Sequence, residues 1–201
     1  MDQVAILNKL HEVGAYQDNG HFVYTSGAHG SVYINKDAIY PHTELIGAMC
    51  RQIAEHFATN NIEVVTGPAV GGVVLSQWTA RHLSAITGRE VLSTYADKSS
   101  KGGFIVRRGY EKLMEDKQVL LVDDIINQGV SIKAMVAAVG ERGGSISKVA
   151  CLVNRGGRQA TEFGVHEVFA LLNIKLDIYE VAKCPLCAQK IPINNNLSKG
   201  K

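Results

Sequence analysis

The chain has 201 residues, of which 46% are hydrophobic and 20% charged, so it is neither a disordered chain nor too short for a core of its own. Its 21 basic and 19 acidic residues give a net charge of +2, which argues against a basic nucleic-acid-binding surface. No apolar run of about 18 residues is present, and the N-terminus lacks the basic segment of a signal peptide. We therefore expect a soluble, cytoplasmic protein that binds neither nucleic acid nor a membrane.

Apolar periodicity predicts alternating helices and strands. In the first helix, Val4, Leu7 and Leu10 are expected to share one face, and Gly14 to end it. Residues 96–117 show no periodic pattern, and residues 194–201 are expected to be frayed. The alternation predicts an α/β fold with a twisted, mostly parallel sheet flanked by helices. Helices are predicted over residues 4–13, 43–59, 73–87 and 130–142, and strands over 22–24, 32–35, 62–66, 90–95, 118–124, 147–153 and 167–170.

The most informative stretch is VLLVDDIINQGVSI, residues 119–132. A buried strand carries Asp123 and Asp124 to its carboxyl end, where open α/β sheets bind ligands. A loop with Gly129 and a helix near Ser131 follow, and their backbone N–H groups form an anion site. Paired acids beside such a site suit a sugar with two hydroxyls, or Mg²⁺. The alternative is an α/β strand end whose acids are incidental.

This segment resembles the phosphoribosyl pyrophosphate (PRPP) signature of type I phosphoribosyltransferases, through Asp123, Asp124, Gly129 and Ser131. Asn127 and Gln128 stand where the family usually has hydroxyl residues. The resemblance implies that the acids hold the ribose hydroxyls and, with PRPP, Mg²⁺. It also implies that the following loop binds the 5-phosphate; the implied PRPP site there comprises Asp123, Asp124, Ile126, Asn127, Gln128, Gly129, Val130 and Ser131.

Two further segments fit the same family and appear in its order. GPAVGG follows a predicted strand and resembles the family's diphosphate loop; on its own it would read equally well as a plain strand-to-helix turn. Residues 96–110 resemble the mobile lid of orotate phosphoribosyltransferases, in which a Lys-x-x-Lys pair neutralises the diphosphate. A histidine common in that lid is Gly103 here. The implied residues are Gly67, Pro68, Ala69, Val70, Gly71 and Gly72 for diphosphate, catalytic Lys98 and Lys101, and Phe104, Arg107 and Arg108 in the lid.

The base-binding region also resembles the orotate branch. Residues 22–36 resemble part of a hood over the base, and Arg155 falls where an arginine faces the orotate carboxylate. A surface turn is the other interpretation of Arg155. The resemblance implies one domain over residues 1–201, with a core at about 43–170 and a hood at about 20–40 and 171–193. The implied base-binding residues are Ser26, Tyr33, Ile34, Lys36 and Arg155.

Four cysteines are too few and too unevenly spaced for a disulfide framework. Cys184 and Cys187 form a Cys-x-x-Cys pair, which is half of a tetrahedral zinc site, whereas Cys50 and Cys151 lie in predicted core elements. The pair also resembles the C-terminus of one orotate phosphoribosyltransferase subgroup. A structural, zinc-binding or redox role stays open, and no histidine is assigned because no two have metal-ligand spacing on a helix.

The resemblance implies transfer of the 5-phosphoribosyl group from Mg-PRPP to a nucleobase, most readily orotate, with release of diphosphate. The cofactor would be Mg²⁺, the partners would be PRPP and a nucleobase, and the protein would be a homodimer. Two alternatives stay open: a purine salvage phosphoribosyltransferase, and a non-enzymatic regulator that binds PRPP or a nucleotide.

Overall fold

The computed structural model describes residues 1–195 and 197, and these residues group into two compact units. The core unit comprises Thr43–Ile174 together with Met1. The terminal unit comprises Asp2–His42 and the chain from Lys175 onward, so both ends of the sequence contribute to it.

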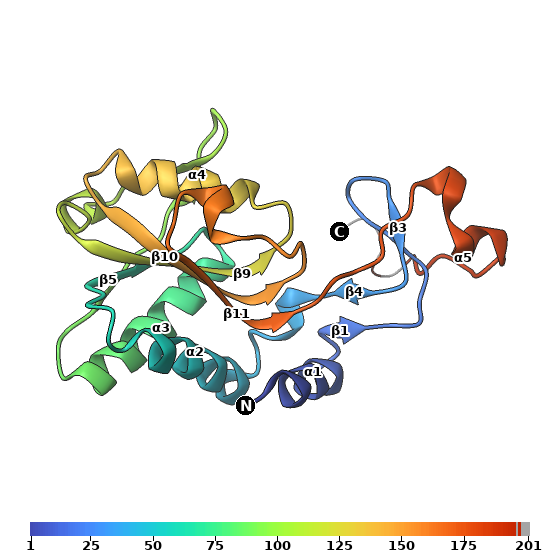
Figure 1. The fold of residues 1–201 in the computed structure, drawn as a ribbon, viewed down its shortest axis with the longest axis horizontal. Coiled ribbons are helices and arrows are strands. Elements are labelled where there is room, and N and C mark those ends of the chain that lie inside the picture. Colours follow the sequence, from blue (N-terminus) through green and yellow to red (C-terminus); the bar gives the residue numbers. More distant parts are fainter. Residues whose placement is uncertain (196, 198–201) are drawn as a thin grey trace. The chain divides into compact units, whose positions relative to one another are not determined.

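A five-stranded sheet in the order β11-β10-β9-β5-β6 forms the centre of the core unit, and every neighbouring pair is parallel. Residues 119–124 of β9 are all buried, because α4 lies over one face of the sheet and α2 and α3 lie over the other (Figure 1). This arrangement confirms the predicted α/β fold. The strands are β5 (Val64–Thr66), β6 (Leu92–Ser93), β9 (Gln118–Ile126), β10 (Ser145–Asn154) and β11 (Glu167–Asn173).

The helices of the core unit follow the predicted apolar spacing. In α2, Ile46, Met49, Ile53 and Phe57 recur every three or four residues and are fully buried. Helix α3 begins two residues earlier than predicted and ends at Gly88, whose φ of 69° suits a residue without a side chain. The helices are α2 (Thr43–Phe57), α3 (Gly71–Thr87) and α4 (Val130–Gly140), with 3-10 turns η2 (Tyr110–Leu113) and η3 (Ala160–Phe163).

The segment without periodicity contains a short antiparallel hairpin, β7 (Asp97–Lys98) with β8 (Phe104–Ile105). The predicted strand over 90–95 is reduced to β6, two residues long. Both errors concern strands of two residues, which are too short to show an alternating apolar pattern.

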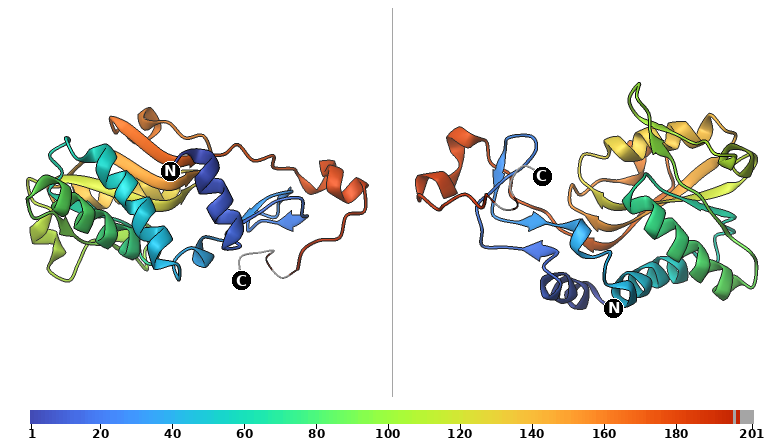
Figure 2. Two further views of the ribbon diagram at one scale, coloured as in Figure 1. Left: turned by 90° about the horizontal axis from the view of Figure 1, so that it is seen from below. Right: turned by 180° about the vertical axis from the view of Figure 1, so that it is seen from behind.

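In the terminal unit, two small antiparallel pairs of strands lie beside the C-terminal segment, as the views in Figures 1 and 2 both show. The backbone of His29 exchanges two hydrogen bonds of 2.8 Å with that of Tyr179. Strands β1 and β3 were not predicted. The elements are α1 (Gln3–Glu12), β1 (Tyr16–Gln17), β2 (Phe22–Val23), β3 (His29–Gly30), β4 (Tyr33–Ile34), η1 (Lys36–Ala38), η4 (Val181–Lys183) and α5 (Pro185–Ala188).

Two expectations for the terminal unit were wrong. Helix α1 buries Ile6 and Leu10, which lie four residues apart on one face, whereas Val4 is exposed. The expected fraying from residue 194 onward fails at its first residue, because Asn194 donates its backbone N–H to the carbonyl oxygen of His21 at 2.7 Å. Residues 196 and 198–201 of that stretch lie outside the described residues.

None of the helices formed by residues 1–195 and 197 combines the length and apolar character that a membrane span requires.

Truncation of Ile53 tests the packing of α2. Ile53→Ala removes a fully buried side chain, so we expect the free energy of unfolding to fall by about 2–5 kcal/mol. Glu55→Ala on the same helix removes only an exposed pair with Arg51 and should cost less than about 1 kcal/mol. Urea denaturation followed by circular dichroism measures both, and equal losses would contradict the assigned core face.

Candidate active site

Three neighbouring parallel strands bring the predicted residues of the core unit to one edge of the sheet. Thr66 of β5 pairs with Leu121 of β9, and Asn154 of β10 pairs with Ile126. The loops that follow these strands therefore begin at the same edge, which is where ligands bind in open α/β sheets. The glycine-rich loop, the two acids and Arg155 all belong to it.

Asp123 and Asp124 lie near the C-terminal end of β9 and are each 7% exposed. The Asp123 carboxylate accepts the backbone N–H of Asp124 at 2.9 Å, and the Asp124 carboxylate accepts that of Ile125 at 2.8 Å. These bonds orient the carboxylates, whose oxygens are of the type that binds sugar hydroxyls or a hard cation. Burial, and then the negative charge of Asp123, raise the pKa of the neighbouring Cys151 thiol, so that thiol is not a nucleophile at neutral pH.

The loop after β9 turns tightly at Gly129 before α4 begins. Gly129 precedes α4 with a φ of 75°, and a Cβ at this position would lie 2.3 Å from the Phe163 ring, so the turn requires glycine. Asn127, Gln128 and Ser131 are exposed around it. The first N–H groups of an α-helix have no partner within the helix, so together with the helix dipole those of α4 are suited to bind an anion, as the sequence predicts.

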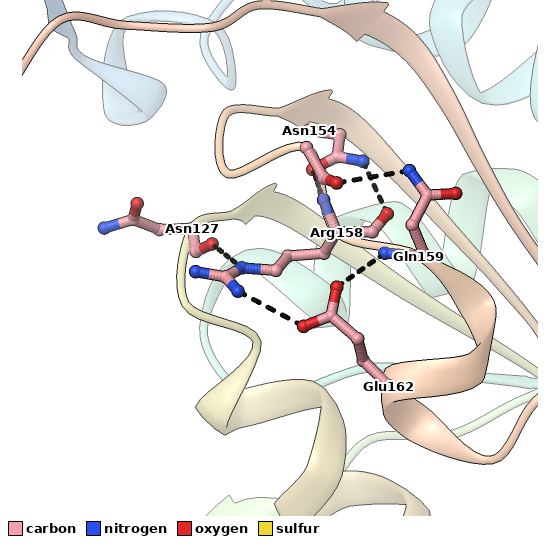
Figure 3. Close-up of polar contacts among 6 residues, drawn as sticks. Asn127, Asn154, Arg158, Gln159 and Glu162 are labelled. Atoms are coloured by element: carbon pink, nitrogen blue, oxygen red, sulfur yellow. Dashed lines mark hydrogen bonds and ion pairs between the residues drawn. The ribbon is translucent and has the colours of Figure 1, made fainter.

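The side chain of Arg158 holds the main chain of this loop (Figure 3). Its Nε donates to the carbonyl oxygen of Asn127 at 2.9 Å, and its Nη1 donates to Glu162 at 3.2 Å. Glu162 also accepts the backbone N–H of Gln159 at 2.9 Å; this bond first, and then Arg158, lower the pKa of the Glu162 carboxyl. Asn154 exchanges two 3.0 Å hydrogen bonds with the Arg158 backbone, so the network also fixes the end of β10.

The glycine-rich loop after β5 approaches β9 closely. A Cβ on Gly67 would lie 2.5 Å from the carbonyl oxygen of Val122, the residue before Asp123, so only glycine fits there. The loop is joined to the start of the hairpin segment, because Ala69 donates to the Ala96 carbonyl at 2.9 Å and Ala96 donates to that of Gly67 at 3.0 Å. The peptide bond between Ala69 and Val70 is cis. Gly71 and Gly72 open α3.

The arginines and the lysines of the β7–β8 hairpin segment have different surroundings. Arg107 and Arg108 pair with Asp97 at 2.7 and 3.2 Å, and the hydrogen bond from Arg107 holds the pKa of that carboxyl below its usual value. Lys98 and Lys101 are instead exposed, and neither forms an ion pair with any residue of the described chain. Phe104 is half-buried in β8. The arginines therefore close the base of the hairpin, while the lysines leave two charges available to an anion.

The other predicted base-binding residues belong to the terminal unit. Ser26 is exposed at the tip of the β2–β3 hairpin, and Ile34 is buried in β4. The ring centroid of Tyr33 lies 5.5 Å from that of Phe22. Lys36 opens η1 with its Nζ 3.9 Å from Asp37. Arg155, in the core unit, is half-buried and donates its backbone N–H to Ile126 at 2.9 Å.

Sequence reasoning missed Asp97, Arg158 and Phe163, each of which holds a functional loop without matching a motif. It also assigned no histidine, although His21 and His29 lie beside Cys184 and Cys187. A hollow of about 560 Å³ between α3 and β6 contains none of the predicted site residues. That hollow borders the opposite side of β5 from β9, the strand that carries the paired acids, so the strand edge with the acids is the candidate site.

Residues 35–185 match the family described as phosphoribosyl transferase domain. The orotate phosphoribosyltransferase of Caldicellulosiruptor saccharolyticus is 36% identical over 87% of this chain and 86% of its own length. That of Chlorobium phaeobacteroides is 31% identical over 96% and 95%.

Solved structures agree at the level of the fold. The orotate phosphoribosyltransferase of Mycobacterium tuberculosis, in complex with Fe(III) dicitrate, superposes with a TM-score of 0.66 at 20% identity over 86% of this chain and 97% of that one. Its complex with PRPP gives a TM-score of 0.53 at 21% identity, over 70% and 80%. The parallel sheet with paired acids and a glycine-capped helix is thus the type I phosphoribosyltransferase fold, and the chain belongs to the phosphoribosyltransferase family.

Proposed function

We propose that this protein transfers the 5-phosphoribosyl group from Mg-PRPP to orotate, giving orotidine 5′-monophosphate and diphosphate in pyrimidine nucleotide biosynthesis. The observation that carries the proposal is the pair Asp123-Asp124 followed by a glycine-capped helix, in a chain whose curated relatives are named orotate phosphoribosyltransferase. The enzyme class is therefore a pentosyltransferase.

The acids and the loop after β9 would bind the ribose 5-phosphate part of PRPP. Asp123 and Asp124 offer carboxylate oxygens to the ribose 2′- and 3′-hydroxyls, each charge-assisted bond being worth about 1.5–3 kcal/mol. Their negative charge also lies near the positive charge that develops on the ribose as diphosphate leaves. The backbone donors from Asn127 to Ser131 would hold the 5-phosphate, and this binding survives the unusual side chains at positions 127 and 128 because it uses the main chain.

The carboxylates of Asp123 and Asp124 also fit Mg²⁺, which enters with PRPP as part of the substrate. Both are oxygen donors with low exposure, and magnesium prefers one or two carboxylates in addition to phosphate oxygens and water. When bound, the ion supplies positive charge that stabilises the diphosphate as it departs.

The glycine-rich loop and the hairpin would bind the diphosphate. Residues 67–72 permit close approach of backbone N–H groups, and Ala96 links this loop to the hairpin that carries Lys98 and Lys101. The two exposed ammonium groups would neutralise the leaving group and exclude water when the hairpin, as a lid, covers it. Gly103 provides no proton donor, so acid–base chemistry by a lid histidine is not part of the proposal.

Orotate differs from the purine bases by its carboxylate, and Arg155 is proposed to contact that group bidentately. Ser26, Tyr33, Ile34 and Lys36 are proposed to contact the base, and a homodimer in the cytoplasm is proposed by analogy with the family. Purine salvage is not favoured, since the curated relatives above 30% identity carry the orotate name.

A panel of bases tests the proposed function. With Mg-PRPP and orotate, uracil, adenine, hypoxanthine or guanine, we expect diphosphate release with orotate alone, because a buried polar contact to a carboxylate rejects bases that lack it. Release of diphosphate with a purine would identify that purine as the substrate instead of orotate. PRPP binding without diphosphate release in the presence of any of the bases would favour a regulator.

Removal of the lysine charges tests the lid. Lys98→Ala and Lys101→Ala should each lower kcat by about 10- to 1,000-fold with a smaller change in the KM for orotate, because the charge they stabilise is largest in the transition state. Lys112→Ala, an exposed lysine in η2, removes the same charge outside the hairpin and should leave kcat unchanged. Steady-state kinetics at constant ionic strength measures both, and an equal effect of Lys112→Ala would refute a specific role.

Replacement of Arg158 tests the loop anchor. Arg158→Ala frees the Asn127 carbonyl, so we expect the KM for PRPP to rise by about 5- to 20-fold while the KM for orotate stays within about twofold. Arg142→Ala, an exposed arginine beyond the end of α4, serves as control. Arg158→Lys should restore part of the affinity, and an unchanged KM for PRPP in Arg158→Ala would show that the loop holds its shape unaided.

A further inference from the structure

Four potential metal ligands gather in the terminal unit, apart from the residues proposed for phosphoribosyl transfer. They are His21, His29, Cys184 and Cys187, and their ligand atoms all lie within 4.8 Å of one another. His21 precedes β2 and His29 opens β3, while the cysteines flank the start of α5. Two segments more than 150 residues apart in sequence thus deliver one imidazole pair and one thiol pair to the same point.

The distances suit four-coordinate binding. The Cys184 and Cys187 sulfurs each lie 3.7 Å from His21 Nε2, and the Cys187 sulfur lies 3.3 Å from His29 Nδ1. A tetrahedral zinc site with Zn–S of about 2.3 Å and Zn–N of about 2.0–2.1 Å has ligand-to-ligand edges of roughly 3.3–3.8 Å. His21 Nε2 and His29 Nδ1 are closer, at 2.8 Å, which is a hydrogen bond between the two rings.

The surroundings of the cluster orient these ligands. His21 Nδ1 lies 2.7 Å from the carbonyl oxygen of Ile191 and therefore carries its proton there, which directs the Nε2 lone pair toward the other three groups. The backbone carbonyl of Ile191 thus binds the His21 ring, and the backbone N–H of Asn194 donates to the carbonyl oxygen of His21. The His29 backbone is paired with Tyr179. Ligand-bearing segments that are already held in place lose little entropy on binding a metal.

Burial and donor type indicate which metal would bind. His21, His29 and Cys184 are 2%, 5% and 4% exposed, whereas Cys187 is exposed, so a metal among them would be covered on three sides by buried ligands. Two thiolates and two neutral imidazoles are the ligand set of structural zinc sites, and two thiolates balance the charge of Zn²⁺. A closed set of four protein ligands leaves no open position for catalysis.

We propose that His21, His29, Cys184 and Cys187 bind one structural Zn²⁺ ion that cross-links the N-terminal hairpin to the C-terminal segment. The terminal unit has short strands of two residues each and few buried apolar side chains, and units of this size commonly need a metal or disulfide for stability. The site does not depend on the identity of the transferred base, so its failure would leave the proposed reaction untouched.

Metal analysis of the full-length protein tests the site. After expression with zinc in the medium and purification without chelator, we expect about one zinc per chain, as four-ligand sites of this kind retain their metal at neutral pH. Exchange for Co²⁺ should give thiolate-to-cobalt charge-transfer bands and the visible absorption of tetrahedral cobalt. A metal-free protein that gives no such spectrum on addition of Co²⁺ would overturn the proposal.

Variants identify the ligands. Cys187→Ser and His29→Asn should each reduce the bound zinc to less than about a tenth per chain after dialysis, since each removes one of four ligands. His42→Asn, an exposed histidine of the same unit, and Cys50→Ala, a buried cysteine of the core unit, should retain the metal. Unchanged zinc content in Cys187→Ser would refute the assignment.

Thiol labelling of the wild-type protein keeps the test independent of how the variants fold. Cys184 and Cys187 should resist alkylation until a chelator is added, and hydrogen exchange over residues 20–31 and 179–191 should accelerate at the same time. A disulfide between Cys184 and Cys187, detected as a loss of two mass units without reductant, would replace zinc by redox chemistry and overturn the proposal.

Discussion

The parallel register of β5, β9 and β10 is the constraint on which the candidate site depends. Because Thr66 lies opposite Leu121 and Asn154 lies opposite Ile126, three loops with different chemistry begin within one edge of the sheet. Backbone hydrogen bonds between strands that are buried on both faces fix this alignment. The acids, the glycine-rich loop and the anion loop therefore occupy a rigid support, and their side chains need only small adjustments to meet a ligand.

The same core unit uses its charged residues for two different purposes. Asp97 is paired with two arginines, Glu162 is held by Arg158, and these pairs fix the bases of loops. Lys98 and Lys101 are exposed, and in the proposed function their charge serves the substrate. Such a division lets a loop be well anchored at its ends while its tip stays electrostatically attractive to an anion.

The sequence allowed the parallel sheet, its long helices and the Asp123-Asp124 loop to be predicted, because these depend on periodicity and on contiguous residues. Strands β1, β3, β7 and β8 escaped prediction, since two residues are too few to show an alternating apolar pattern. Arg158, in a loop, and Asp97, in β7, escaped prediction for a related reason: neither belongs to a motif or a periodic pattern that would mark it. The Cys-x-x-Cys pair was visible, but His21 and His29 are eight positions apart in the β2–β3 segment, and only the fold brings them to the cysteines.

The hydrogen bond from Arg158 to the carbonyl oxygen of Asn127 has a consequence for how this enzyme can change over time. The anchor recognises an atom that every amino acid possesses, so its strength is indifferent to the side chain at that position. Mutations at positions 127 and 128 can accumulate and alter the chemical surface offered to the phosphate while the path of the loop is inherited intact. The departure of Asn127 and Gln128 from the family's usual hydroxyl residues is then a change that this anchor tolerates, because it alters the side chains and leaves the path of the main chain unchanged.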